Sequence, residues 1–244
     1  MEPCLTNIIF ALKEVADKKQ ALILSKFFKT GPGQYGEGDI FWGIKVPEQR
    51  KIALKYWQVR IQDVQVLLAS PVHEQRLVAL LILVKKYEES KDFVLKNQII
   101  NFYLKNKRTV NNWDLVDLSA PKLLGDFIFN YLSRKEAHQV LLNLATSSNL
   151  WARRIAIVST LYSIRQGKHQ ETFLLVKKLK NDKHDLIHKA MGWMLREVGK
   201  HVDQKLLLSF LDKNANILPR TSLRYAIEHL SEKQRLNYLK ISKK

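Results

Sequence analysis

Residues 151–164 read WARRIAIVSTLYSI, with apolar side chains three and four residues apart and no glycine or proline. That spacing puts the apolar side chains on one face of an α-helix. The same period recurs in residues 72–87, 135–145, 172–180 and 186–198, and no sustained strand-like alternation occurs. Glycine, proline, serine and asparagine fall mainly between these segments, where they end helices. The sequence therefore predicts an all-α fold.

A faint internal repeat organises the predicted helices. Similar stretches place a basic residue just before a small or apolar position that is expected to face inward. If Ala79, Asp117, Ala156, Met191 and Ala226 are equivalent, the spacings are 38, 39, 35 and 35 residues. This is close to the period of a two-helix repeat of HEAT type. We therefore expect one domain over residues 1–244, a HEAT-like α-solenoid whose second helices line a concave basic groove.

The charge of the chain restricts its partners. Its 244 residues include 41 lysines and arginines against 23 aspartates and glutamates, a formal net charge of +18. Such a surplus points to nucleic acid, a membrane surface or an acidic partner. The basic residues recur from Lys13 to Lys244 instead of forming one tail or one amphipathic helix. This distribution indicates a binding surface instead of a disordered basic arm and argues against a membrane.

The sequence also bears on the compartment. Cys4 is the only cysteine, so no intrachain disulfide can form, which fits a reducing cytoplasm. The first residues lack a basic stretch followed by an apolar one, and the longest apolar run, residues 77–84, is too short to cross a bilayer. We expect a soluble, cytoplasmic, monomeric protein.

Two sequence patterns resemble ligand sites but lack residues that those sites require. Residues 30–39 hold four of the nine glycines, but no Gly-Lys-Ser/Thr follows, and Glu37 and Asp39 would repel phosphate. We interpret this glycine-rich stretch as a connector between helices. His184 and His188 are four residues apart but lack the glutamate of an H-E-x-x-H zinc motif. No metal or cofactor is expected.

Trp113 and Asp117 are four residues apart, so a helix would place an indole and a carboxylate on one face. A surface that binds polyanions gains nothing from an acid unless that acid stabilises positive charge. A structural role is the alternative, with Trp113 in the core and Asp117 serving as a buried cap or pairing with Arg76 or Arg154.

Four segments together resemble the AlkD family of bacterial DNA alkylation repair glycosylases, over roughly residues 20–230: 43–50 (GIKVPEQR), 113–117 (WDLVD), 148–154 (SNLWARR) and 189–197 (KAMGWMLRE). The resemblance implies a HEAT-like superhelix that excises cationic N3- and N7-alkylated purines. It assigns Trp113, Asp117 and Trp193 to the catalytic cleft, and Arg154 to holding the DNA backbone beside the lesion. Phe27 departs from the family, in which a tyrosine is expected near the cleft.

The chemistry of alkylated purines agrees with that assignment. A purine alkylated at N3 or N7 is already cationic and leaves readily, and positive charge then develops on the sugar as in other glycosyl hydrolyses. A carboxylate such as Asp117 would stabilise this transition state more than the ground state. Each indole would add a cation–π attraction of about 0.5 to 2 kcal/mol. We expect a monofunctional DNA glycosylase of base excision repair that releases 3-methyladenine and 7-methylguanine from double-stranded DNA.

Basic residues at equivalent repeat positions are the expected contacts to DNA phosphates. These are Arg154, Lys189 and Arg224, with Lys45 and Arg50 as weaker candidates. Two other functions remain open. The first is a non-catalytic HEAT-like protein that binds branched or distorted DNA, against which the presence of Asp117 argues. The second is a helical scaffold for proteins, which would carry an apolar concave face.

Overall fold

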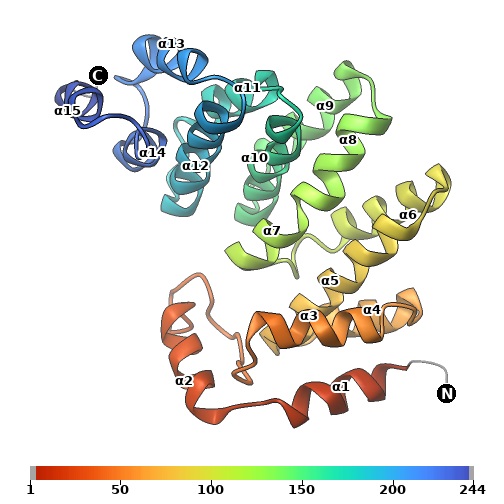
Figure 1. Ribbon diagram of the computed structural model, residues 1–244. Helices are drawn as coiled ribbons and strands as arrows, with labels where there is room; N and C mark the ends of the chain where they lie inside the picture. The colour runs from red at the N-terminus through yellow and green to blue at the C-terminus, as the bar shows by residue number, and fades with distance from the viewer. Residues whose placement is uncertain (1–3, 242–244) are drawn as a thin grey trace. The chain divides into compact units, whose positions relative to one another are not determined.

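The computed structural model describes residues 4–241, and most of these residues are helical (Figure 1). A single β-bridge joins Ile40 to Val72. The helices are α1 (Leu5–Glu14), α2 (Lys18–Phe27), α3 (Val46–Lys55), α4 (Ile61–Leu68), α5 (His73–Glu89), α6 (Phe93–Lys105), α7 (Trp113–Ser119), η1 (Pro121–Gly125, a π-helical turn), α8 (Asp126–Tyr131), α9 (Arg134–Ala145), α10 (Leu150–Arg165), α11 (Gln170–Leu179), α12 (Asp185–His201), α13 (Gln204–Asn214), α14 (Arg220–Ala226) and α15 (Glu232–Lys240). The predicted all-α class is confirmed, and each of the five segments with helical periodicity lies largely within one helix.

The chain divides into two compact units, Met1–Ser119 and Ala120–Lys244. In the first unit, α5 is the central helix, because α3, α4, α6 and α7 all contact it. Its apolar side chains are buried all around the helix, including Leu77, Leu80 and Leu83 at 1% exposure or less. A helix that is apolar on every side is expected in the middle of a core.

The first turn of α5 also fixes the chain that enters α3. The carboxylate of Glu74, fully buried, accepts hydrogen bonds from the backbone N–H groups of Trp42, Gly43 and Ile44 at 2.8–3.2 Å. Gly43 has a positive φ of 81°, and a Cβ there would lie 2.0 Å from the carbonyl oxygen of Asp17. Only glycine fits this close approach, so the path of residues 42–44 is tightly determined.

The second unit is a succession of helix pairs. In chain order these are α9 with α10, α11 with α12 and α13 with α14. α9 contacts α10, α11 and α13 both contact α12, and the second helices contact one another, α10 with α12 and α12 with α14 (Figure 1). Ala156, Met191 and Ala226 lie on these three second helices and are 0–1% exposed. The predicted inward positions of the two-helix repeat are therefore confirmed in this unit. The basic groove remains a prediction.

Two glycines let neighbouring helices of the second unit approach closely. A Cβ on Gly125 of η1 would lie 2.4 Å from the carbonyl oxygen of Ser159 on α10. A Cβ on Gly192 of α12 would lie 2.4 Å from the carbonyl oxygen of Ser222 and 2.5 Å from Cβ of Tyr225, both on α14. Ser222 also donates a hydrogen bond of 2.8 Å to the carbonyl of His188. The contact between α12 and α14 therefore depends on the missing side chain of Gly192.

No helix within residues 4–241 combines the length and apolar character needed to span a membrane.

We predict that Gly192→Ala lowers the free energy of unfolding by about 1–3 kcal/mol, because the new methyl group forces α12 away from α14. Thermal or urea unfolding followed by circular dichroism measures this change. Lys200→Ala, at an exposed position of the same helix, is the control and should change stability by less than about 0.5 kcal/mol. Equal stability of the wild type and Gly192→Ala would show that the two helices have room for a side chain.

Candidate active site

Trp113 and Asp117 lie on α7, as their spacing predicted. Both are partly exposed, whereas Asp114, Leu115 and Val116 between them are buried. The helix therefore packs its inner face into the first unit and leaves the indole and the carboxylate at the surface. Their shared face is set by the helical period, since residues four apart are neighbours on one side.

The indole of Trp113 is held on three sides. The ring of Phe28 stacks on it, with centroids 5.3 Å apart and planes at 21°, and Phe27 meets it edge-on at 5.9 Å. The indole Nε1–H donates a hydrogen bond of 3.2 Å to the hydroxyl of Tyr35. Phe27 itself has no hydroxyl. The hydroxyl beside this indole belongs to Tyr35, which lies in the glycine-rich stretch. Trp113 is thus fixed in orientation and still partly exposed.

A buried ionic network lies behind Trp113. The imidazole of His73 lies between two carboxylates, with Nδ1 3.3 Å from Asp39 and Nε2 2.8 Å from Asp114. The guanidinium of Arg76 contacts Asp39 at 2.6 Å and donates to the carbonyl of Ser70 at 2.8 Å. The side chains of His73, Arg76 and Asp39 are 2–4% exposed. Ions so far from water require one another, because an unpaired buried charge is very costly.

The network determines the protonation of its members. Burial by itself would lower the pKa of His73, but its hydrogen bonds to Asp114 and Asp39 outweigh this effect and raise the pKa to about 9. The imidazole is therefore an imidazolium at neutral pH. Burial opposes ionisation of Asp39, yet the hydrogen bond from His73 and the charge of Arg76 bring the pKa of that carboxyl below its usual value. Two cations and two anions thus share one buried site.

Asp117 acts electrostatically on the core beneath it. Tyr103 is fully buried and its hydroxyl lies 3.0 Å from the hydroxyl of Ser119, at the end of α7. Burial raises the pKa of Tyr103, and the negative charge of Asp117 raises it further. The phenol consequently stays neutral and hydrogen-bonds to α7.

Trp193 lies on α12 in the second unit and is also partly exposed. Its Nε1–H donates a hydrogen bond of 3.1 Å to Glu197, four residues further along the helix. Glu197 also lies 3.2 Å from Nε2 of His201 and 3.6 Å from Arg196. The combination of a tryptophan and an acid four residues later thus occurs at both predicted tryptophans. Glu197 was missed from the sequence, although this shared spacing was a signal that could have identified it.

Arg154 is buried, with 5% of its surface exposed, and it donates a hydrogen bond of 2.5 Å to the carbonyl of Leu186 in the first turn of α12. Its neighbour Arg153 contacts Asp182 at 2.6 Å and the carbonyls of Ser147 and Ser148 at 3.0 Å. Both arginines therefore fasten α10 to its surroundings.

The other predicted DNA contacts lie nearer the surface. Lys189, one turn after the start of α12, pairs with Asp185 at 2.8 Å, and both side chains are at least 40% exposed. Arg224 on α14, Lys45 just before α3 and Arg50 within α3 are exposed. These residues belong to different units, Lys45 and Arg50 to the first and Lys189 and Arg224 to the second.

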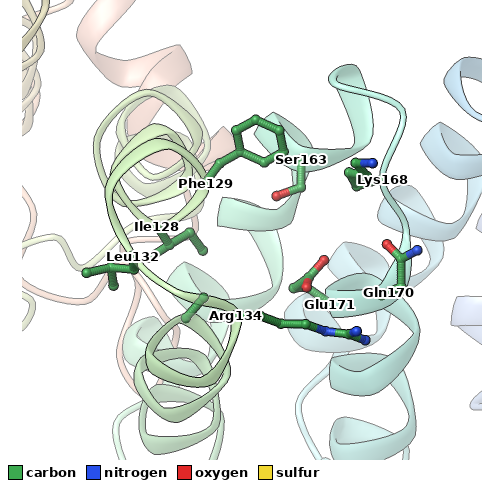
Figure 2. Close-up of a pocket in the computed structure, with 9 residues that line it drawn as sticks. Ile128, Phe129, Leu132, Arg134, Ser163, Lys168, Gln170 and Glu171 are labelled. Atoms are coloured by element: carbon green, nitrogen blue, oxygen red, sulfur yellow. The ribbon is translucent and has the colours of Figure 1, made fainter.

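Two cavities of the described residues lie away from the predicted site residues. Figure 2 shows a cavity of about 310 Å³ in the second unit, into which Arg134 and Glu171 reach from α9 and α11. A more apolar cavity of about 560 Å³ in the first unit is lined by Trp57, Lys86 and their neighbours. None of the predicted site residues lines either cavity. The described part of the chain also contains no group of three or more His, Cys, Asp or Glu side chains that could hold a metal ion.

Comparison with known proteins places this geometry in a family. No protein of curated function matches the chain. A solved structure described as a predicted DNA alkylation repair enzyme from Enterococcus faecalis is similar in fold, with a TM-score of 0.70 and 16% identity over 89% of this chain and 97% of that one. The sequence model of the DNA alkylation repair enzyme family matches residues 8–230. Since this match covers most of the 244 residues, the chain belongs to the family of DNA alkylation repair enzymes.

Proposed function

We propose that this protein is a monofunctional DNA glycosylase of base excision repair that hydrolyses the N-glycosidic bond of cationic N3- and N7-alkylated purines in double-stranded DNA. One observation carries the proposal. A carboxylate, Asp117, lies one helical turn from a partly exposed and rigidly held indole, Trp113, in a strongly basic chain of the alkylation repair family. A carboxylate at this place would stabilise a positive charge that develops on a bound nucleotide.

The proposed reaction uses the charge of the damaged base. As the C1′–N bond breaks, the bond electrons neutralise the cationic purine, which leaves without an added proton. The sugar takes on oxocarbenium character, and the carboxylate of Asp117 stabilises it. Water adds at C1′ and gives up a proton, for which Asp117 is the acceptor we propose. The products are the free base and an abasic site.

The two tryptophans are proposed to recognise the cationic base. An indole face attracts a cation through its quadrupole, by about 0.5 to 2 kcal/mol depending on desolvation. Trp113 needs a fixed orientation for this, and the ring of Phe28 with the hydroxyl of Tyr35 supplies it. The hydrogen bond from Trp193 to Glu197 plays the corresponding part on α12.

Contacts to the phosphates are assigned to the basic residues. Lys189, Arg224, Lys45 and Arg50 are exposed enough to neutralise phosphates directly. Arg154 is proposed to hold the backbone beside the lesion while it fixes the start of α12 through Leu186. The alternative function is a non-catalytic protein that binds branched or distorted DNA, and an excision assay separates the two.

We expect the purified protein to release 7-methylguanine and 3-methyladenine from methylated duplex DNA, with no added metal or cofactor. Chromatography of the released bases measures this activity. A duplex containing uracil is the control, because uracil is neutral and the site supplies no evident acid for a neutral leaving group. Inertness toward methylated purines would favour the non-catalytic alternative, and efficient uracil release would contradict the proposed chemistry.

Asp117→Asn should lower the single-turnover rate of 7-methylguanine release by about 100-fold or more, since it removes a charge aimed at a developing cation. Duplex affinity and the unfolding temperature should change little. Glu48→Gln, which neutralises a surface carboxylate on α3, is the matched control and should excise at the wild-type rate. A near-normal rate with Asp117→Asn would give Asp117 a structural role.

Arg224→Ala should make the dependence of duplex affinity on salt shallower by about one unit on logarithmic axes, because one phosphate contact is lost. Titrating a fluorescent duplex at several salt concentrations gives this slope. Lys233→Ala, an exposed charge on α15, is the comparison and should leave the slope near that of the wild type. Parallel slopes for the wild type and Arg224→Ala would remove Arg224 from the interface.

A further inference from the structure

The buried network behind Trp113 has no part in the proposed chemistry and needs an explanation of its own. Ion pairs this deeply buried are often no more stabilising than apolar residues of the same size, because desolvation of the charges offsets their attraction. A gain in stability therefore does not explain why His73, Asp39 and Asp114 are charged. Their role is to position the chain, because each hydrogen bond holds two segments in a defined place relative to one another.

The network joins three segments that are far apart in the sequence. His73 begins α5, Asp39 ends the glycine-rich stretch 34 residues earlier, and Asp114 lies in the first turn of α7, 41 residues later. We name Asp39, His73 and Asp114 the histidine clamp. Its imidazole also contacts two aromatic rings that stack on each other, Phe41 at 4.6 Å and Phe28 at 5.0 Å.

The contact between His73 and Asp114 determines the rotation of α7 about its own axis. Asp114 directly follows Trp113, so anchoring Asp114 to His73 fixes the rotation of the helix about its axis. Successive residues differ by about 100° around a helix, so Trp113 and Asp117 lie about 40° apart, and holding Asp114 inward fixes the direction in which both point. A rotation of α7 by one residue would displace both from the positions that the proposed reaction requires.

The other end of the clamp holds the segment that hydrogen-bonds to the indole. Asp39 is bound to His73, Arg76 and the amide of Asn112, the last at 3.3 Å. Earlier in the same stretch, Tyr35 accepts the hydrogen bond from the indole of Trp113. The clamp therefore fixes both the helix that carries the indole and the loop that orients it.

We propose that His73 is a positioning residue, whose imidazolium bridges Asp39 and Asp114 and so fixes the orientation of Trp113 and Asp117. The catalytic consequence rests on the proposed glycosylase function, whereas the orientation of the indole can be measured without any substrate. His73 itself is behind α7 and is given no contact with DNA or with the reacting atoms.

The bridge requires a protonated ring. An imidazolium donates an N–H to each carboxylate, whereas a neutral imidazole has only one N–H to donate. The charged groups that face the ring are Asp39 from the loop, Asp114 from α7 and Arg76 from α5. The pKa of His73 is raised from 6.5 to about 9 in the folded protein. Its contribution to stability is therefore full below about pH 6.5, declines above it and is lost as the pH rises through 9.

The orientation of Trp113 is tested by fluorine NMR on protein containing 5-fluorotryptophan. The chain has five tryptophans, and Trp113→Phe identifies the signal of Trp113. In the wild type we expect this signal to shift with a midpoint near pH 9. In His73→Phe, which keeps an aromatic ring beside Phe28 and Phe41 but donates no hydrogen bond, the signal should be displaced and independent of pH in this range.

The catalytic consequence is tested by single-turnover excision of 7-methylguanine at saturating protein. His73→Phe should lower the rate by about 10-fold or more, as expected from a small misplacement of reacting groups, while duplex affinity stays within about threefold. His138→Phe is the matched control, since it removes a histidine 3.3 Å from a carboxylate, Glu171, in the second unit. It should leave both the rate and the Trp113 signal unchanged.

The outcomes separate the proposals. Wild-type excision and an unmoved Trp113 signal in His73→Phe would overturn the clamp. If the wild type releases no alkylpurine, the glycosylase proposal fails, and the fluorine signal still decides whether His73 orients Trp113. If His73→Phe does not fold, Asp114→Asn is used in its place, because it keeps the side-chain shape and removes one carboxylate. A wild-type Trp113 signal and excision rate in Asp114→Asn would also overturn the proposal.

Discussion

The geometry of the first unit depends on the first turn of α5. His73, Glu74 and Arg76 are all 3% exposed or less, and together they bind residues 39 to 44 and the start of α7. The N-terminus of a helix favours an acid, and Glu74 fits that position while accepting three backbone hydrogen bonds. His73 and Arg76 then neutralise Asp39 and Asp114. The candidate residues on α7 are thus held in place by the ions beneath them.

The helices could be predicted because their signal is local. Apolar residues three and four apart must lie on one face, and the repeat register placed Ala156, Met191 and Ala226 correctly because one residue per repeat faces the neighbouring helices. The clamp could not be predicted, because its members are 34 and 41 residues apart and no pattern in the chain links them. The glycine-rich stretch is a connector, as expected, yet the charge of Asp39 that argued against phosphate serves the buried network.

The direction of a long basic side chain is equally hard to predict. Arg153 and Arg154 are adjacent on a helix whose sequence gives each a potential place on the surface, but both bind backbone carbonyls. Such bonds satisfy carbonyls near helix ends and fix where α12 begins. Lys189 and Arg224 occupy the equivalent repeat positions and lie nearer the solvent. At equivalent repeat positions the Cα–Cβ bonds point in the same direction, but the hydrogen-bond partners near each residue determine where its long side chain ends.

The proposed reaction on a cationic base places opposing electrostatic demands on a strongly basic protein. In the proposed function, its net charge of +18 would attract DNA from a distance, but the same charge would disfavour a cation forming at the damaged nucleotide. Screening by salt separates the long-range attraction of DNA from the local effect on the forming cation. At physiological salt a charge acts over about 8 Å, so the charges nearest to the reacting atoms dominate there. Behind Trp113, His73 and Arg76 balance Asp39 and Asp114, so this network adds no net positive charge beside Asp117. The buried ions can therefore fix α7 rigidly without opposing the stabilisation that we assign to Asp117.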